Sequence, residues 1–184
     1  MCVCTAASAV GDRVPHAEAG VGAIATQACT NILYGTKGLT LLKTGVSPQA
    51  ALKAMLKEDP QRESRQVIII DKDGKTAAFT GKETIDWKGH FTGKDYVVAG
   101  NMLVGGRVLD AMIHAFESSE DELEERLMKA LEAGQEAGGD KRGKTSAALL
   151  VVRKEQVGAC PFLDLRVDGH REPVKELRRK LINT

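Results

Sequence analysis

Residues 14–59 read VPHAEAGVGAIATQACTNILYGTKGLTLLKTGVSPQAALKAMLKED, and this stretch decides the fold prediction. A run of small, strand-compatible residues extends from Gly20 to Ala28 and ends in a polar break. Two helical segments follow, separated at residues 44–46, where Ser47 is a good N-cap and Pro48 suits the first helical position. Their apolar face is supplied by Leu39, Leu41, Leu42, Leu52, Met55 and Leu56. The stretch therefore predicts a buried strand covered by a helix pair.

The polar break at the end of this strand has two interpretations. Gln27, Thr30 and Asn31 stand beside glycines at a strand end, where binding and catalytic groups often lie. Alternatively, the asparagine closes a turn and caps the following helix. Cys29 lies in the same segment, and a small buried side chain is its expected role.

The rest of the chain alternates between strand and helix patterns. Helical periodicity marks residues 108–116, a segment from Ser119 with Glu122 completing a capping box, and a C-terminal segment from Pro173. The predicted strands are Met1–Ser8, Arg65–Asp71, Thr76–Gly81, Tyr96–Ala99, Ser146–Val152 and Leu163–Val167. The DG turn within residues 71–75 predicts antiparallel pairing of the second and third. This order predicts a single α+β domain over residues 1–184.

Composition limits the function classes. A net charge of +1 gives no electrostatic reason for nucleic-acid binding, and an aromatic content of 4% argues against base stacking. No apolar run approaches the roughly 20 residues of a membrane span, and the first residues lack a basic signal-peptide region. We therefore expect a cytoplasmic protein whose partner is a small molecule.

The cysteines predict no metal site. Cys2 and Cys4 share one face of a strand, and neither they nor Cys29 and Cys160 form paired C-x-x-C motifs. Free thiols are the default in a reducing compartment. No metal and no cofactor are expected.

Five motifs, in order along the chain, carry a family resemblance. They are PHAEAGVGAIATQACTNILYGTKGLTLL (15–42), DWKGHFTG (86–93), GN (100–101), GGDKRGKTSAALLVV (138–152) and LDLRVDGHREPVKELRRKL (163–181). Together they resemble the domain of unknown function 1028 family, whose members are similar in fold to the N-terminal nucleophile (Ntn) hydrolases. The resemblance implies a four-layer αββα sandwich with two largely antiparallel sheets. It also implies that this chain lacks the first family strand, because typical relatives carry one before the segment that matches residues 2–8.

The resemblance implies a hydrolase that acts on an amide or amidine-like C–N bond of a small molecule. An Ntn hydrolase attacks with the side chain of its first residue and uses its own α-amine as base. Cys2 would qualify if Met1 were removed, although the alignment places Cys2 inside the second family strand. The alternative is a non-catalytic protein that binds a small molecule on the same fold.

Other candidate site residues lie in polar segments. His90, in a loop, is a candidate acid or base, and Ser146 is an alternative nucleophile at a strand start. The loop from Gly138 to Ser146 matches G-x-x-x-x-G-K-T, yet it runs from helix to strand, the reverse of a phosphate-binding P-loop. Its Arg142 can hold a carboxylate or phosphate. The expected substrate-binding residues are Gln27, Asn31, Arg65, Asn101, Asp140 and Arg142.

Apolar residues beside glycines predict a homodimer. Leu33, Tyr34, Leu103 and Val104 suggest more apolar surface than one subunit hides.

Overall fold

A computed structural model describes residues 1–154 and 161–184, so Cys160 lies outside the described residues. The strands are β1 (Cys2–Thr5), β2 (Pro15–Glu18), β3 (Gly22–Ala28), β4 (Arg65–Asp71), β5 (Thr76–Thr80), β6 (Gly89–Gly93), β7 (Tyr96–Gly100), β8 (Ser146–Val151) and β9 (Leu163–Val167). The helices are α1 (Leu33–Lys43), α2 (Pro48–Glu58), α3 (Arg107–Glu117), α4 (Leu123–Glu136) and α5 (Pro173–Ile182), with 3₁₀ turns at Val10–Asp12 and Arg62–Ser64.

All pairing between the described strands is antiparallel. One sheet has the order β2-β3-β4-β5, a second has the order β1-β8-β9, and β6 and β7 form a separate hairpin. In the first sheet Ile24 of β3 lies opposite Ile69 of β4. The chain is therefore a mixed α and β fold with antiparallel sheets, as predicted.

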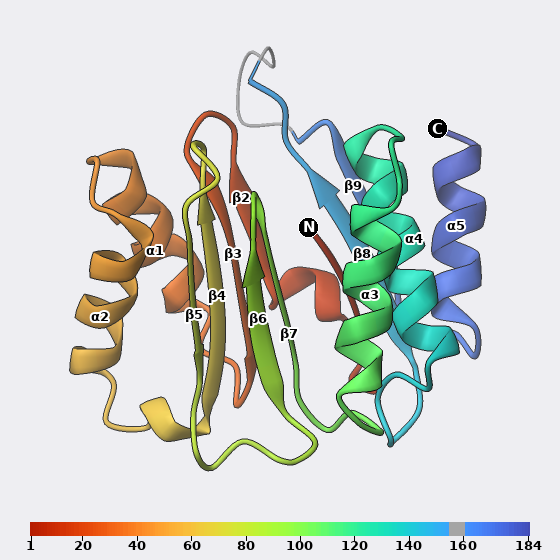
Figure 1. The fold of residues 1–184 in the computed structure, drawn as a ribbon, viewed down its shortest axis with the longest axis horizontal. Coiled ribbons are helices and arrows are strands. Elements are labelled where there is room, and N and C mark those ends of the chain that lie inside the picture. Colours follow the sequence, from red (N-terminus) through yellow and green to blue (C-terminus); the bar gives the residue numbers. More distant parts are fainter. Residues whose placement is uncertain (155–160) are drawn as a thin grey trace.

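Helices α1, α2, α4 and α5 cover the outer faces of the two larger sheets, whereas α3 packs against α4 and strand β7 (Figure 1). Helices α1 and α2 pack on the four-stranded sheet around a core that contains Ile24, Tyr34 and Ile69. Helices α4 and α5 pack on the three-stranded sheet around Met128, Leu149 and Leu177. The facing inner sides meet in a smaller buried cluster of Val10, Val14, Ala25 and Ala148.

Local sequence chemistry explains the long elements. The Ser47 side chain accepts a hydrogen bond from the Ala50 N–H, with Pro48 at the first helical position, as expected for the start of α2. Strand β4 alternates between the outer core, reached by Val67 and Ile69, and the inner side, reached by Ile68. Both faces are covered, which is why its sequence is apolar almost throughout. The predicted strands and helices in these segments are confirmed.

The sequence missed two strands, and the predicted start of one helix was wrong. Strand β2 was not foreseen because it is short, begins with a proline and lies at a sheet edge. Strand β6 is bounded by glycines and largely exposed, so it lacks an apolar signal. Helix α4 begins at Leu123, and the Ser119 hydroxyl bonds the Asp121 carboxylate instead of forming a capping box with Glu122.

Within the described part of the chain, no helix combines the length and the apolar character needed to cross a membrane.

Candidate binding site between the sheets

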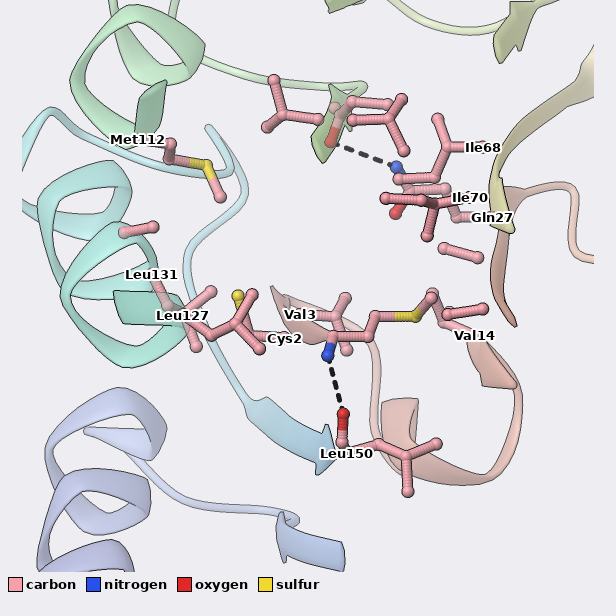
Figure 2. Close-up of a pocket in the computed structure, with 18 of the residues that line it drawn as sticks. Cys2, Val3, Val14, Gln27, Ile68, Ile70, Met112, Leu127, Leu131 and Leu150 are labelled. Carbon is pink, nitrogen blue, oxygen red and sulfur yellow. Dashed lines mark hydrogen bonds between the residues drawn. The ribbon is translucent and has the colours of Figure 1, made fainter. Parts of the chain in front are cut away.

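A cavity of about 980 Å³ lies between the two sheets. Figure 2 shows Ile68 and Ile70 of the four-stranded sheet on one side and Met112 and Leu131 of the helical layer on the other. Strand β1 and Leu150 of β8 form its floor. Most of the wall is apolar, and polar side chains line both ends: Gln27, Asn101, Asp140 and Arg142 where β3 and β7 stop, and Asp71, Lys72, Asp73 and Asp95 where these strands begin.

Gln66 does not line the cavity itself, but it holds the polar residues that do. It is fully buried, and its Nε2 contacts Thr80 Oγ1, Gly89 O and Gly100 O at 2.9, 3.0 and 2.9 Å. Its Oε1 accepts hydrogen bonds from Gln27 Nε2 at 2.7 Å and from Asn101 Nδ2 at 3.1 Å. Both oxygen lone pairs are then used, so the two neighbouring carboxamides are fixed in position.

Gln27 and Asn101 present their carboxamide groups at the cavity wall. Both line it, and Gln27 Nε2 also lies 3.4 Å from Ala99 O (Figure 2). No described residue donates to Gln27 Oε1 or Asn101 Oδ1. Two carboxamide oxygens held side by side are suited to accept N–H groups from a ligand amide.

The loop after α4 closes the same end. Lys141 N donates to Met102 O at 2.8 Å, and Leu103 pairs with Asp140, so the loop is joined to the segment that follows Asn101. Arg142 donates to Asp140 through Nε at 2.9 Å and through NH2 at 2.5 Å. Asp140 and Arg142 therefore form an ion pair, and both residues line the cavity.

Asp140 is the more buried partner of this pair. Its side chain is 8% exposed, against 45% for Arg142. Burial by itself raises the pKa of the Asp140 carboxyl, but hydrogen bonds from Arg142 outweigh burial and leave the pKa below its usual value. NH2 of Arg142 also reaches Thr5 Oγ1 at 3.3 Å, so strand β1 ends at this polar group.

The cysteines of β1 are not activated. Both Cys2 and Cys4 line the cavity, with Cys2 beside Leu127 in Figure 2. Burial raises the pKa of the Cys2 thiol and raises that of Cys4 to about 12. Both are therefore neutral thiols at pH 7, and a thiol is a weaker nucleophile than a thiolate.

Arg65 and Asn31 lie outside the predicted cleft. Arg65 points to the helix-covered face, where Nε donates to Asp59 Oδ2 at 2.9 Å and NH2 donates to Gln61 Oε1 at 2.8 Å. Asn31 Oδ1 accepts from Leu33 N at 3.1 Å and closes the turn into α1, which is the alternative interpretation given above. Neither lines the cavity. In contrast to the expected cleft, neither contributes to this cavity, because Arg65 is a buried ion-pair partner and Asn31 is a turn residue.

Ser146 and His90 are also away from the cavity wall. The buried Ser146 hydroxyl donates to Ala7 O at 2.5 Å and accepts from Val10 N at 3.3 Å, so it fastens the loop after β1. His90 is exposed on β6, and its Nδ1 lies 2.8 Å from Thr80 Oγ1. Their placement does not support a nucleophile or a base in this cavity. Cys29 is exposed, so the expectation of a small buried side chain was wrong.

Sequence reasoning missed Gln66 and Thr5. The available signal for Gln66 was one carboxamide inside the otherwise apolar run RQVIIID, since a buried polar group needs partners. Among the described residues, no group of three or more His, Cys, Asp or Glu side chains could hold a metal ion.

The chain matches one protein-family model and is similar to a solved structure of the same family. A family model described as "Family of unknown function (DUF1028)" matches residues 1–177. The chain is similar to the crystal structure of a protein from Silicibacter pomeroyi assigned to the same family model. The TM-score is 0.91 and the identity 33%, over 99% of this chain and 81% of that chain. No curated protein matches the chain.

Proposed function

The chain belongs to the DUF1028 family, whose function is unknown, and from its own geometry we propose that it binds an amide-containing small molecule between its sheets. The observation that carries the proposal is the cavity itself, apolar along most of its length and closed by carboxamides at one end. Pockets for small molecules usually combine these two features.

The residues that line the cavity indicate which chemical groups the ligand should have. An apolar body fits between Ile68 and Ile70 on one side and Met112 and Leu131 on the other. An amide head fits against Gln27 and Asn101, whose oxygens accept N–H groups. Arg142 lies at the same end and is suited to a carbonyl oxygen or a carboxylate.

Hydrolysis of the amide is the second candidate. It is favoured by the order of layers, helices outside and two antiparallel sheets inside, because the Ntn-hydrolase-like fold is built in this order. Cys2 lines the cavity and is the nucleophile that this candidate would use. We rank it below binding because burial raises the pKa of the Cys2 thiol.

The binding proposal is tested with N-octanoylglycine amide, which has an apolar tail and an amide head. Titration calorimetry should give saturable binding with a negative heat-capacity change, as expected when apolar surface is buried. Met112→Trp fills the cavity and should abolish binding. His114→Trp is the matched control, since His114 is exposed on the same helix. Equal binding by the two variants, or no binding by the wild type, would overturn the proposal.

Hydrolysis is tested in the same mixture. Mass spectrometry should find the probe intact after incubation, with wild type and Cys2→Ala giving the same result and the same affinity. Release of octanoate or ammonia by the wild type, lost in Cys2→Ala, would instead favour the hydrolase.

A further inference from the structure

The outer edge of β5 lies beside a surface groove with cationic side chains, and we propose that it binds an extended acidic segment of a partner protein as an added strand. Peptides bind in this way at exposed sheet edges, where main-chain hydrogen bonds supply affinity and side-chain contacts supply specificity. The inference does not depend on the cavity between the sheets or on the ligand proposed for it.

Strand β5 is the last strand of the four-stranded sheet. Among the described strands it pairs only with β4 (Figure 1). Next to the end of this ladder, Gly81 N donates to Arg65 O at 2.9 Å, which marks a hydrogen-bonded position. Such positions alternate with positions whose backbone groups point away from the partner strand. The register therefore directs the N–H and C=O groups of Ala78 and Thr80 out of the sheet.

A hydrogen bond at the start of β5 shows that its outward backbone groups are within reach of other donors. Gln49 of helix α2 donates through Nε2 to Thr76 O at 2.6 Å, at the position two residues before Ala78. Among the described residues, no hydrogen bond is formed by the outward backbone groups of Ala78 and Thr80. These groups are available to a strand from another molecule.

A groove of about 420 Å³ runs between α2 and β5. Leu52 is buried beneath it, and Leu56 and Phe79 are half-buried, so the floor is apolar. Neighbouring residues of paired strands place their side chains on the same face of a sheet. A residue bound opposite Phe79 would therefore direct its side chain over this groove, and so would every second residue of the bound segment.

The rim of the groove is positively charged. Lys53, Lys57 and Arg62 line it, and no Asp or Glu does. Lys53 and Lys57 are exposed four residues apart on α2, and neither forms an ion pair within the described part of the chain. Like charges at this spacing destabilise a helix slightly. Carboxylates from a bound segment would remove this repulsion, and their methylene groups would cover the apolar floor.

The same charges favour an acidic partner over a second copy of this chain. Lysines beside a strand edge deter pairing between identical edges, because two copies would bring their cations together. An acidic segment gains both the backbone hydrogen bonds and the ion pairs. We therefore expect acidic residues at alternate positions of the segment, on the face that covers the groove.

The test uses a six-residue peptide of alternating glutamate and threonine with both ends blocked. One analogue carries glutamine in place of glutamate, and another is N-methylated at every residue and has no backbone donors within the strand. Calorimetry on the full chain should show saturable binding of the glutamate peptide and at least tenfold weaker binding of each analogue. No binding of the glutamate peptide, or equal affinity for either analogue, would overturn the proposal.

A pair of charge variants tests the groove. Lys53→Gln with Lys57→Gln should bind the glutamate peptide at least tenfold more weakly and should melt no lower than the wild type, because a repulsion is removed. Lys94→Gln with Lys175→Gln is the matched control, since both lysines are exposed outside the groove and the change in net charge is the same. Equal losses in the two variants would assign the binding to unspecific attraction and contradict the proposal.

Hydrogen exchange locates the contact. The Ala78 and Thr80 amides should exchange at least tenfold more slowly when the peptide is bound. Phe79 is the internal control, since the register directs its amide to β4 and its exchange should change much less. Binding without slower exchange at Ala78 and Thr80 would refute strand addition. Slow exchange of these amides in the chain alone, increasing with protein concentration, would identify a second copy as the occupant and also refute it.

Discussion

At the scale of single residues, Gln66 determines how the polar end of the cavity is built. One buried carboxamide joins β4 to β3, to the β6–β7 hairpin and to Asn101. The Asp140–Arg142 pair is attached to the same end by the backbone of the loop. The site therefore consists of a fully buried anchor, Gln66, and the groups attached to it at the cavity wall, among which the Arg142 side chain is 45% exposed.

Arg142→Ala should weaken the binding of N-octanoylglycine, the carboxylate form of the probe, by about 1.5–3 kcal/mol through loss of a charge-assisted hydrogen bond. The melting temperature should change little, because the Arg142 side chain is 45% exposed and Asp140 keeps Ala6 N as a neighbour at 3.4 Å. Calorimetry and thermal denaturation measure the two effects. Arg142→Lys is the control that keeps the charge without the planar fork. A variant that melts far below the wild type would assign the pair to bracing of the loop alone.

Asp59→Asn should destabilise the fold by about 3–5 kcal/mol at pH 7, because it leaves Arg65 buried without a counter-charge. The Asp59 and Arg65 side chains are 9% and 8% exposed, and Tyr34 OH also donates to Asp59 at 3.0 Å. Urea denaturation measures the loss. Asp73→Asn, at an exposed turn, is the matched control. Replacing both partners, with Asp59→Leu and Arg65→Met, should cost less than Asp59→Asn.

The same pair gives a pH dependence. Burial raises the pKa of the Asp59 carboxyl, but hydrogen bonds from Arg65, Gln61 N and Tyr34 outweigh it and hold the pKa below its usual value. A carboxyl whose pKa is lowered by folding adds stability above its unfolded pKa of about 3.9. This stability is lost as the pH falls below about 4, and the acid-induced loss should be smaller in Asp59→Asn. If the free energy of unfolding of the variant fell below pH 4 as steeply as that of the wild type, the acid-induced loss would not be due to Asp59.

At the scale of elements, close helix–sheet packing depends on missing side chains. A Cβ added at Gly38 of α1 would overlap Ile24 Cδ1, whereas one added at Gly105, before α3, would meet no atom within 4 Å. Gly38→Ala should therefore cost about 1–3 kcal/mol by overpacking, and Gly105→Ala should change stability little. Urea denaturation compares them. Equal costs would show that α1 shifts to accommodate the methyl group.

Sequence patterns predicted most elements but not the faces of the covered strands. The apolar run of β4 and the helical periods of α1 to α3 were sufficient for their identification. In β4, the Arg65 side chain faces the helices and the Gln66 side chain faces the space between the sheets. A shift of the strand register by one residue would exchange the faces on which these two side chains lie. Because both faces are buried, no alternation in the sequence distinguishes them. Gln27, Asn101, Asp140 and Arg142, which the sequence analysis expects in a binding site, all line the cavity, and each stands at a strand end or in a glycine-rich loop.

At the scale of the whole molecule, apolar side chains remain on the surface. Leu33 and Val104 are exposed by 55% and 44%, whereas Tyr34 is buried and Leu103 is half-buried. We expect a homodimer that covers part of this surface. Light scattering at micromolar concentration should give twice the mass of the chain. Leu33→Glu should shift the mass toward the monomer, and Leu33→Met is the control. A monomer in all three samples would contradict the expectation.

The small inner cluster of Val10, Val14, Ala25 and Ala148 has a dynamic consequence. Each outer core holds its own helices and sheet together, while this seam of short side chains joins the two halves beside the cavity. The free energy needed to separate packed groups rises with the apolar area between them, so the halves part at lower cost than either half unfolds. We therefore expect local opening to separate the two halves at this seam, and we expect the rate of this opening to limit how fast an occupant enters and leaves the cavity.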